Sequence, residues 1–313
     1  MKLLTGLAAF ALIAWVSGVS VSKAEAATTA ISDGYFTTDD GARIHYLRAG
    51  DSHAAPALVL IPGWTLTASL WHEQLQHFSN DRTVIAVDSR SQGASSIMLT
   101  GNTPERRAQD LHELLASLHV EHCVLVGWSQ GAQDVAAYVQ QFGTDSLDGV
   151  VFVDSPVSAG TNEVDIRKEF TKAILSGLSR YASQPGDYSA GMVRSIFKRP
   201  HPAADIDAVI AQAQRTPPAV GAAMLVSDIF GADRRPALRK IDRPALVIAS
   251  ANSPLLDAQK TMASDIEGSR FLAVPNVGHA VFVDDPQTFD SALTQLLAKA
   301  DSVRGGKPES MRQ

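Results

Sequence analysis

The chain has 313 residues, of which 45% are hydrophobic and 19% are charged. This is the composition of an ordinary globular protein, and the length allows one large domain with an insertion or two small domains. Its 33 acidic and 27 basic residues give a formal net charge of −6 without a long run of either sign, which argues against a nucleic-acid partner and favours a small, mostly uncharged ligand.

The first residues of the chain, 1–26, predict a cleaved secretory signal peptide. Lys2 supplies a positive charge, residues 3–21 are mainly apolar, and Ala-Glu-Ala at residues 24–26 is a small-x-small cleavage site. An uncleaved membrane anchor is the alternative, although glycine and serine residues dilute the apolar stretch. We expect cleavage near Ala26, a periplasmic or secreted protein that begins at about residue 27, and no stable membrane insertion after the signal is removed.

From residue 34 onward, short apolar runs alternate with amphipathic segments, which is typical of strands separated by helices. A hairpin is expected first, with strands at 34–38 and 42–49 around an Asp-Gly turn. Later runs rich in apolar and β-branched residues predict parallel strands that are buried on both faces. They lie at 57–61, 83–87, 123–126, 149–153, 245–250 and 270–274.

Helices are expected between these strands, and one interval breaks the alternation. The helices lie at 70–78, 103–118, 130–142, 257–266 and 286–300. Residues 156–217 show no convincing strand but contain helical patterns at 164–178 and 204–214, so we expect an inserted helical cap there. The sheet domain would then comprise 27–155 and 218–300, and the polar residues 301–313 would form a flexible tail.

A serine lies between two glycines directly after the strand predicted at 123–126. The sequence G-W-S-Q-G at 127–131 also precedes a predicted helix, which is the context that a G-x-S-x-G nucleophile turn requires. A serine hydroxyl is a poor nucleophile at neutral pH, so it has to be presented beside a base, and flanking glycines allow the chain to approach closely. Ser129 is therefore the candidate nucleophile.

The candidate base follows the last predicted strand. Of the nine histidines in the chain, His279 alone falls in a loop at the carboxyl end of a core strand. A histidine near a serine can act as its general base. No spacing typical of a metal site is evident in the sequence, so no metal is predicted.

With these motifs the chain resembles the α/β-hydrolases, in particular the cap-bearing group of esterases, lactonases, carbon–carbon hydrolases and cofactor-free haloperoxidases. The resemblance covers about residues 34–300. It includes L-I-P-G-W at 60–64, where the family has its oxyanion loop, and D-S-R-S-Q-G at 88–93, where the family has D-x-R-x-x-G. It implies a mostly parallel, eight-stranded sheet flanked by helices. It also implies an oxyanion hole made by the backbone N–H groups of Trp64 and Gln130. We interpret Asp88 and Arg90 as scaffold beneath the site.

The acid that would orient His279 has several candidates. The family's usual loop, here residues 249–254, contains no carboxylate. Asp154 ends the strand at 149–153 and so reaches the same sheet edge, a position that some relatives use, and we favour it. Asp257 is the second candidate, although it stands where a helix should begin and is most simply an N-cap. A dyad assisted by Asn252 or Ser253 is the third.

The resemblance implies a serine hydrolase that cleaves a small or medium apolar carboxylic ester or lactone, with no cofactor. A serine at position 129 argues against the dehalogenases and epoxide hydrolases of this fold, which need an aspartate there. The alternatives are a cofactor-free perhydrolase or haloperoxidase, a carbon–carbon hydrolase, or a noncatalytic ligand receptor built on a hydrolase scaffold. The candidate pocket residues are apolar: Trp64, Trp128, Phe170, Ile174, Leu178, Met192 and Phe197.

Overall fold

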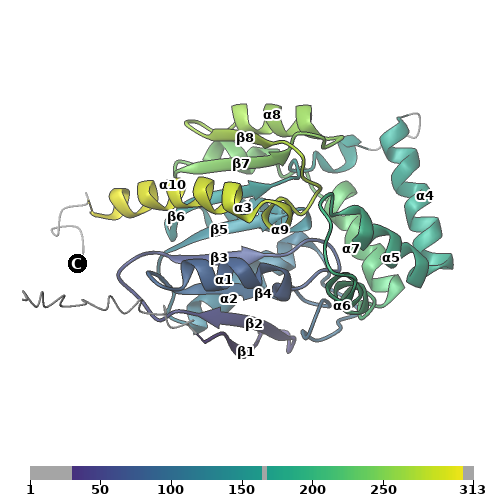
Figure 1. The fold of residues 1–313 in the computed structure, drawn as a ribbon, viewed down its shortest axis with the longest axis horizontal. Coiled ribbons are helices and arrows are strands. Elements are labelled where there is room, and N and C mark those ends of the chain that lie inside the picture. Colours follow the sequence, from purple (N-terminus) through teal and green to yellow (C-terminus); the bar gives the residue numbers. More distant parts are fainter. Residues whose placement is uncertain (1–29, 164–167, 306–313) are drawn as a thin grey trace, which may run out of the picture.

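The computed structural model describes residues 30–163 and 168–305, which form an eight-stranded sheet with helices on both faces (Figure 1). The predicted signal peptide lies outside these residues. The strands are β1 (Ser32–Thr37), β2 (Arg43–Ala49), β3 (Ala57–Ile61), β4 (Val84–Val87), β5 (Cys123–Trp128), β6 (Leu147–Val153), β7 (Ala245–Ser250) and β8 (Arg270–Val274). Their order is β1-β2-β4-β3-β5-β6-β7-β8, and all pairings are parallel except β1 with β2 and β2 with β4. The predicted mostly parallel sheet is confirmed.

The central strands are buried on both faces because their side chains alternate between two hydrophobic cores. In β3, Leu58 and Leu60 belong to one core, whereas Val59 and Ile61 belong to the other. Every residue of β3 and β5 is buried. This two-residue period over continuously apolar strands is what a sheet covered on both sides requires.

Helices cover both of these faces. One core includes side chains of α1 (His72–Phe78) and α10 (Pro286–Gly305). The other includes side chains of α2 (Pro104–Ser117), α3 (Gln130–Phe142) and α8 (Leu256–Ser264). The start of α2 follows the sequence prediction, because Thr103 is its N-cap and the hydroxyl oxygen accepts a hydrogen bond from the N–H of Arg106 at 3.2 Å.

Four helices between β6 and β7 lie together at one end of the sheet, on the right of Figure 1. They are α4 (Glu169–Ser183), α5 (Pro185–Ser195), α6 (Ala203–Ala213) and α7 (Pro218–Phe230). The cap was predicted to end at 217, but α7 lies beyond that boundary and contacts α4. Pro218 accounts for the difference, because it occupies the first turn of α7, where a proline starts a helix instead of ending one. We therefore place α7 in the cap.

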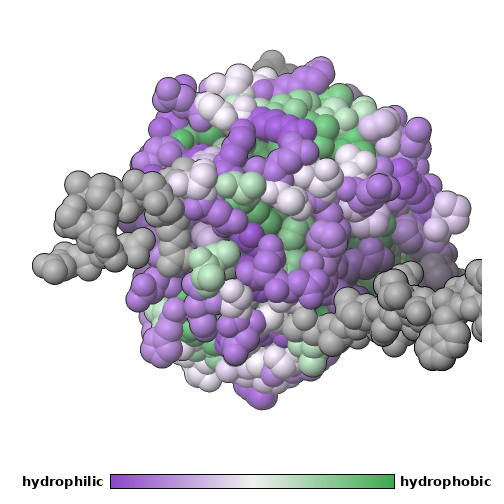
Figure 2. Space-filling view, turned by 60° about the vertical axis from the view of Figure 1, so that its left-hand side comes forward, coloured by the Kyte–Doolittle hydropathy of each residue, from purple (hydrophilic) through white to green (hydrophobic). Residues whose placement is uncertain are grey.

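The surface away from the cap is mixed in character. Figure 2 turns the left side of Figure 1 toward the viewer and shows hydrophobic residues in small areas among hydrophilic ones. Large exposed hydrophobic residues of the described chain are scattered: Tyr35, Ile97 and Leu99 lie outside the cap, and Leu175 and Val226 lie on α4 and α7. None of the helices in residues 30–163 and 168–305 has the length and apolar character needed to cross a bilayer.

Candidate active site

Ser129 and Asp154 emerge from neighbouring parallel strands at the carboxyl edge of the sheet. Trp128, the last residue of β5, is in register with Val153, the last residue of β6. The N–H of Ser129 donates to the carbonyl of Val153 at 3.0 Å, and the N–H of Asp154 donates to Ile248 of β7 at 2.7 Å. The sheet pairing thus continues one residue past the strands and fixes where both side chains leave the edge.

The turn at Ser129 explains its two glycines. Ser129 has φ 55° and ψ −112°, a conformation that a non-glycine residue adopts at a cost of about 1–3 kcal/mol. A Cβ added to Gly127 would lie 2.2 Å from the carbonyl oxygen of Gly131, and one added to Gly131 would lie 2.7 Å from that of Ile61. Only hydrogen fits at these two positions, so the turn can bring the serine to the head of α3.

Asp154 is the carboxylate that contacts the imidazole of His279. Its Oδ2 lies 2.8 Å from Nδ1 of His279, and its Oδ1 accepts hydrogen bonds from the N–H of Ser250 at 2.9 Å and from Nε2 of Gln259 at 3.1 Å. The side chain of Asp154 is only 3% exposed. A carboxylate held in this way keeps the proton on Nδ1 and leaves Nε2 of His279 as the basic nitrogen.

The other candidate acids do not contact His279. The side chain of Asp257 is 96% exposed and forms an ion pair with Lys260 at 3.1 Å. Asp257 lies inside the first turn of α8, whose N-cap is Leu255, so the predicted N-cap role is wrong. The backbone N–H of Asn252 donates to the Ser250 hydroxyl, and the Ser253 hydroxyl accepts from Gln259.

The buried side chain of Trp128 supports the loop that bears His279. Trp128 is fully buried, and its Nε1 donates to the carbonyl of His279 at 2.9 Å. The indole also contacts the imidazole ring, with ring centroids 5.4 Å apart, and the ring of Phe282. Trp128 was predicted to line the pocket, but it supports the histidine instead, because its side chain packs into the core beneath the loop.

A second carboxylate, Asp284 in the short helix α9 (Val281–Asp284), joins the His279 loop to the cap. Its Oδ2 accepts from the N–H groups of Gly278 at 2.6 Å and Lys198 at 2.8 Å, and its Oδ1 lies 2.8 Å from Nε2 of His201. These hydrogen bonds hold the pKa of Asp284 below its usual range even though burial alone would raise it. The sequence analysis missed Asp284, since its partners lie up to 86 residues away.

The two predicted oxyanion-hole amides belong to segments that adjoin Ser129. Gln130 is the first residue of α3, and Trp64 follows Gly63, at which an added Cβ would be 3.2 Å from Cβ of Ser129. Among the described residues, neither the N–H of Trp64 nor that of Gln130 has a hydrogen-bond acceptor. An N–H at a helix start and one in the adjoining loop can both point at a developing oxyanion.

The segment at 88–93 is scaffold for this edge. Buried Gln92, which the sequence analysis did not single out, donates to the carbonyls of Gly63 and Leu66 and accepts from the N–H of Thr65 at 2.8 Å. Its side chain therefore ties down the Trp64 loop. The other two polar residues form the contacts expected of scaffold: Asp88 accepts from the N–H of Ala68 and Ala94 and contacts His45, and Arg90 pairs with Asp110 and Asp40.

Ser129, Asp154 and His279 line a cavity of about 980 Å³. Most of its wall is apolar and comes from α4, α7, α8 and the segment after β6. Trp64 and Ile174 line it as predicted, whereas Trp128, Leu178, Met192 and Phe197 do not. Met192 and Phe197 pack against the hydrophobic core instead. The side chain of Phe170 lies outside the described part of the structure.

Ser129 and His279 share this cavity, but no hydrogen bond joins the hydroxyl of Ser129 to the imidazole among the described residues. In sites without a substrate, the bond between nucleophile and base is often long and shortens when the substrate binds. The free Nε2 of His279 and the free hydroxyl are the two groups that a substrate carbonyl would meet.

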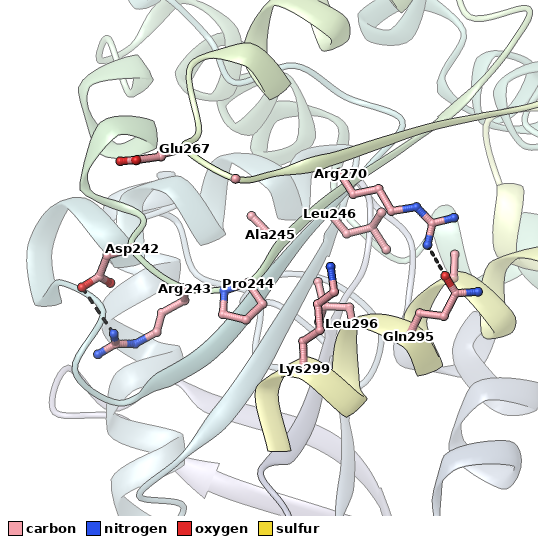
Figure 3. Close-up of a pocket in the computed structure, with 12 residues that line it drawn as sticks. Asp242, Arg243, Pro244, Ala245, Leu246, Glu267, Arg270, Gln295, Leu296 and Lys299 are labelled. Atoms are coloured by element: carbon pink, nitrogen blue, oxygen red, sulfur yellow. Dashed lines mark hydrogen bonds and ion pairs between the residues drawn. The ribbon is translucent and has the colours of Figure 1, made fainter. Parts of the chain in front are cut away.

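A second cavity, of about 400 Å³, lies at the start of β7 and is bounded by β8 and α10 (Figure 3). Its arginines are engaged with neighbours: Arg243 contacts Asp242 at 3.3 Å, and Arg270 donates to Gln295. Lys299 also lines it. It sits at the opposite end of β7 from Ser250, so it is separate from the Ser129 edge. Within residues 30–163 and 168–305, no three or more His, Cys, Asp and Glu side chains are grouped to hold a metal.

Comparison with known proteins identifies the family of the chain. Residues 56–286 match the family described as alpha/beta hydrolase fold, and the chain belongs to that family. It is 26% identical over 276 residues to a bifunctional esterase/perhydrolase from Acinetobacter calcoaceticus, covering 84% of this chain and 99% of the relative. It is 28% identical over 280 residues to a non-heme chloroperoxidase from Kitasatospora aureofaciens, covering 84% and 98%.

Solved structures show the same fold. A bromoperoxidase from Bacillus anthracis superposes with a TM-score of 0.77 at 23% identity and covers 85% of this chain and 100% of its own. An esterase from Rhodococcus superposes with a TM-score of 0.73 at 25% identity and covers 85% and 98%. The family resemblance drawn from the sequence is therefore confirmed. Because its relatives include esterases and perhydrolases, the chain is a hydrolase of the alpha/beta hydrolase fold family.

Proposed function

We propose that this protein is a serine hydrolase that cleaves a small or medium apolar carboxylic ester or lactone through an acyl-enzyme on Ser129. The observation that supports it most is the 2.8 Å contact between Asp154 Oδ2 and His279 Nδ1 in the cavity that Ser129 lines. Nucleophile, base and orienting acid are the parts that acyl transfer by serine requires.

In this mechanism Nε2 of His279 removes the proton of the Ser129 hydroxyl as the oxygen attacks the ester carbonyl. The backbone N–H groups of Trp64 and Gln130 stabilise the oxyanion of the tetrahedral intermediate. The imidazolium, stabilised by Asp154, then returns the proton to the leaving alcohol as the acyl-enzyme forms. Water, deprotonated by His279, attacks the acyl-enzyme and releases the acid.

The substrate class follows from the cavity. Its volume of about 980 Å³ is at the upper end of the range for sites that bind small molecules, and its wall is mostly apolar. The charged residues that line it include Lys168, Glu169 and Arg235, with Asp228 on α7. An apolar acyl or alcohol group of small to medium size fits such a space.

Covalent labelling tests the proposal against the noncatalytic receptor. The full chain is treated with a fluorophosphonate, and the adduct is located by peptide mass spectrometry, with His279→Ala as the matched control. We expect one adduct on Ser129 and much slower labelling of the control. A protein that stays unlabelled, or is labelled elsewhere, would favour the receptor. Initial rates on p-nitrophenyl esters of increasing acyl length, and then on lactones, define the substrate range.

Perhydrolysis is a second candidate activity, and the similarity to the bifunctional esterase/perhydrolase supports it. Hydrogen peroxide would replace water in the attack on the acyl-enzyme and release a peracid. The measurement is bromination of monochlorodimedone in acetate buffer with peroxide and bromide. Ser129→Ala should abolish it, because the peracid needs the same acyl-enzyme.

We further propose that the protein acts outside the cytoplasm on a small-molecule substrate. The charged start, apolar stretch and small-x-small site of residues 1–26 support export. Expression of the full chain in a bacterial host, followed by fractionation and N-terminal sequencing, tests this. We expect a periplasmic protein that begins near Ala27, whereas an intact N-terminus in the cytoplasmic fraction would contradict it.

A further inference from the structure

The loop that carries the Trp64 amide is fixed from two sides, and one of them is the cap. On the side of the sheet domain, the side chain of Gln92 binds the backbone of the loop. On the other side, the Nε1–H of Trp64 donates to the carbonyl of Gly221, in α7, at 2.8 Å. This hydrogen bond is buried and joins residues 157 positions apart. The side chain of Trp64 therefore attaches a segment of the predicted oxyanion hole to a cap helix.

Aromatic side chains of the cap contact the same indole. The ring of Tyr181, in α4, meets the ring of Trp64 edge-on with centroids 4.9 Å apart, and the ring of Tyr188, in α5, does so at 6.2 Å. Trp64 and Tyr181 also belong to a small hydrophobic cluster with Val220 and Met224 of α7. Edge-to-face pairs stabilise a defined ring geometry beyond simple burial. Three cap helices thus specify the orientation of the indole.

Gly221 leaves little room around this arrangement. A Cβ added at Gly221 would lie 2.6 Å from the hydroxyl oxygen of Tyr181 and 2.9 Å from its Cε1, closer than real Cβ atoms approach other atoms. A side chain at this position would therefore displace Tyr181 or α7, and with either of them a contact of the indole. Trp64 lines the active-site cavity, whereas Gly221 and Tyr181 are not among the described residues that do. Both can act on the site through Trp64.

The backbone next to Trp64 has a conformation that needs external contacts to hold it. Thr65 has φ 59°, in the left-handed region that a β-branched residue rarely adopts. Such a conformation persists where the surroundings over-determine it. The hydrogen bond from the N–H of Thr65 to Gln92 is one such contact, and the anchored indole of Trp64 is another. If the loop relaxed, the backbone of Trp64 would turn, and its N–H would turn with it.

The second oxyanion-hole amide is built differently. The N–H of Gln130 belongs to the first residue of α3, a core helix that directly follows Ser129 and β5. We propose that the cap positions one half of the oxyanion hole, because Tyr181 and Gly221 hold the indole of Trp64 and thereby direct its backbone N–H at the oxyanion. This inference rests on the proposed function, in which that N–H is one of two donors. Without the indole contacts, only the donor of Gln130 stays in place.

Variants of Tyr181 test this positioning role. Tyr181→Ala removes the ring that packs on the indole, whereas Tyr181→Phe keeps the ring and is the matched control. Complete loss of one oxyanion donor costs about 10²- to 10³-fold in kcat, and a misdirected donor should cost less. We therefore expect kcat for p-nitrophenyl butyrate to fall by about 10- to 100-fold in Tyr181→Ala with little change in KM, and to stay within about twofold in Tyr181→Phe. Gly221→Ala is the second variant and should behave as Tyr181→Ala does.

A transition-state mimic separates positioning from a general loss of structure. The oxygen of Ser129 adds to the carbonyl of a butyl trifluoromethyl ketone, His279 takes the proton, and the new oxyanion lies in the hole. The alcohol obtained by reducing that ketone has the same shape but forms no oxyanion. In Tyr181→Ala the inhibition constant of the ketone should rise about as much as kcat falls, whereas that of the alcohol should stay within about twofold. Unchanged kcat in a folded Tyr181→Ala, or equal weakening of both inhibitors, would overturn the proposal.

The NMR resonance of the Trp64 indole N–H tests the anchor without catalysis. It is assigned as the indole peak that is lost in Trp64→Phe, and its exchange with solvent is measured. We expect slow exchange in the wild-type chain and in Tyr181→Phe, and faster exchange in Tyr181→Ala and Gly221→Ala. Rapid exchange in the wild-type chain would overturn the inference by itself. A chain that hydrolyses no ester and does not react with the fluorophosphonate would contradict the proposed function, and the exchange rates would still test the contact between indole and cap.

Discussion

The carboxyl edge of the sheet holds two histidine–aspartate pairs with the same separation: Nδ1 lies 2.8 Å from Oδ2 in His279 with Asp154 and in His45 with Asp88. The two pairs differ at the other ring nitrogen. Nε2 of His45 lies 3.0 Å from Asp33, whereas Nε2 of His279 has no partner among the described residues. Both ring nitrogens of His45 have carboxylate partners, so of these two imidazoles only that of His279 has a nitrogen free to exchange a proton with a substrate.

The two imidazoles also differ in how exposed they are and in whether they reach the cavity. The side chain of His279 is 33% exposed and lines the cavity with Ser129, whereas that of His45 is 8% exposed and lies between β1 and the turn after β4. Although burial lowers the pKa of His45, its two carboxylates together raise it above the ordinary value. A histidine–aspartate contact alone therefore does not identify a catalytic base. The distinguishing feature is an Nε2 that has no partner and lies in the same cavity as a nucleophile.

The largest predicted effect distinguishes the pair of His279 and Asp154, which lines the cavity, from the buried pair of His45 and Asp88. Ser129→Ala or His279→Ala should lower kcat for ester hydrolysis by about 10⁶-fold, because each removes a member of a unit that acts together. His45→Gln should stay within a few fold of wild type. The measurement is steady-state hydrolysis of a p-nitrophenyl ester by each purified variant. A loss of activity in His45→Gln as large as that in His279→Ala, with the fold intact by circular dichroism, would contradict the distinction.

An intermediate effect is predicted at Asp284, which holds the loop of His279 and has no counterpart beside His45. Asp284→Asn places an amide NH₂ against backbone donors, so the imidazole should shift and kcat should fall by about 10- to 100-fold with little change in KM. The neighbouring Asp285→Asn is the matched control, because Asp285 forms its ion pair with Arg199 nearer the surface, and it should stay within twofold. If kcat fell equally in Asp284→Asn and Asp285→Asn, Asp284 would not have a specific role in positioning His279.

A smaller effect, on stability instead of rate, is predicted for His45. His45→Gln should lower the free energy of unfolding by about 1–3 kcal/mol at pH 6, because it removes hydrogen bonds to charged partners. Since the folded pKa is raised, this stabilisation is complete below the unfolded pKa of about 6.5 and is lost as the pH rises through the folded value. Denaturant unfolding at pH 6 and pH 9 measures it. A difference between wild type and variant that grew with pH would contradict the prediction.

The smallest effect is predicted for Asp33, the exposed partner that closes off Nε2 of His45. Its side chain is 73% exposed, so Asp33→Asn should change the free energy of unfolding by less than about 1 kcal/mol. Ester hydrolysis should not change, because opening Nε2 of His45 does not bring a nucleophile to it. The contradicting result would be ester hydrolysis by the double variant Ser129→Ala, Asp33→Asn, because it would show that a free Nε2 on His45 is sufficient for catalysis without a serine nucleophile.

The sequence predicted the sheet and the candidate triad because both depend on local patterns. The apolar runs marked the strands, and the ends of β5, β6 and β8 placed Ser129, Asp154 and His279 at one edge. Contacts between distant segments left no such pattern. Trp128 was assigned to the pocket because the sequence does not show that His279 lies over its indole.

Other features also depended on distant contacts. Asp228 meets Arg107 across 121 positions of the chain, and Asp284 meets Lys198 across 86. No local spacing marks either carboxylate. The predicted end of the cap, at residue 217, lies directly before α7, whose first turn contains Pro218.

The most direct test of the site is the comparison of Asp154→Asn with Asp257→Asn. Both variants replace a carboxylate by an amide of the same shape, but only Asp154 contacts His279, and the side chain of Asp257 is 96% exposed. We predict that kcat/KM for a p-nitrophenyl ester falls by about 10⁴-fold in Asp154→Asn and stays within twofold in Asp257→Asn. Near-normal turnover by Asp154→Asn, together with a loss in Asp257→Asn, would contradict the proposed triad.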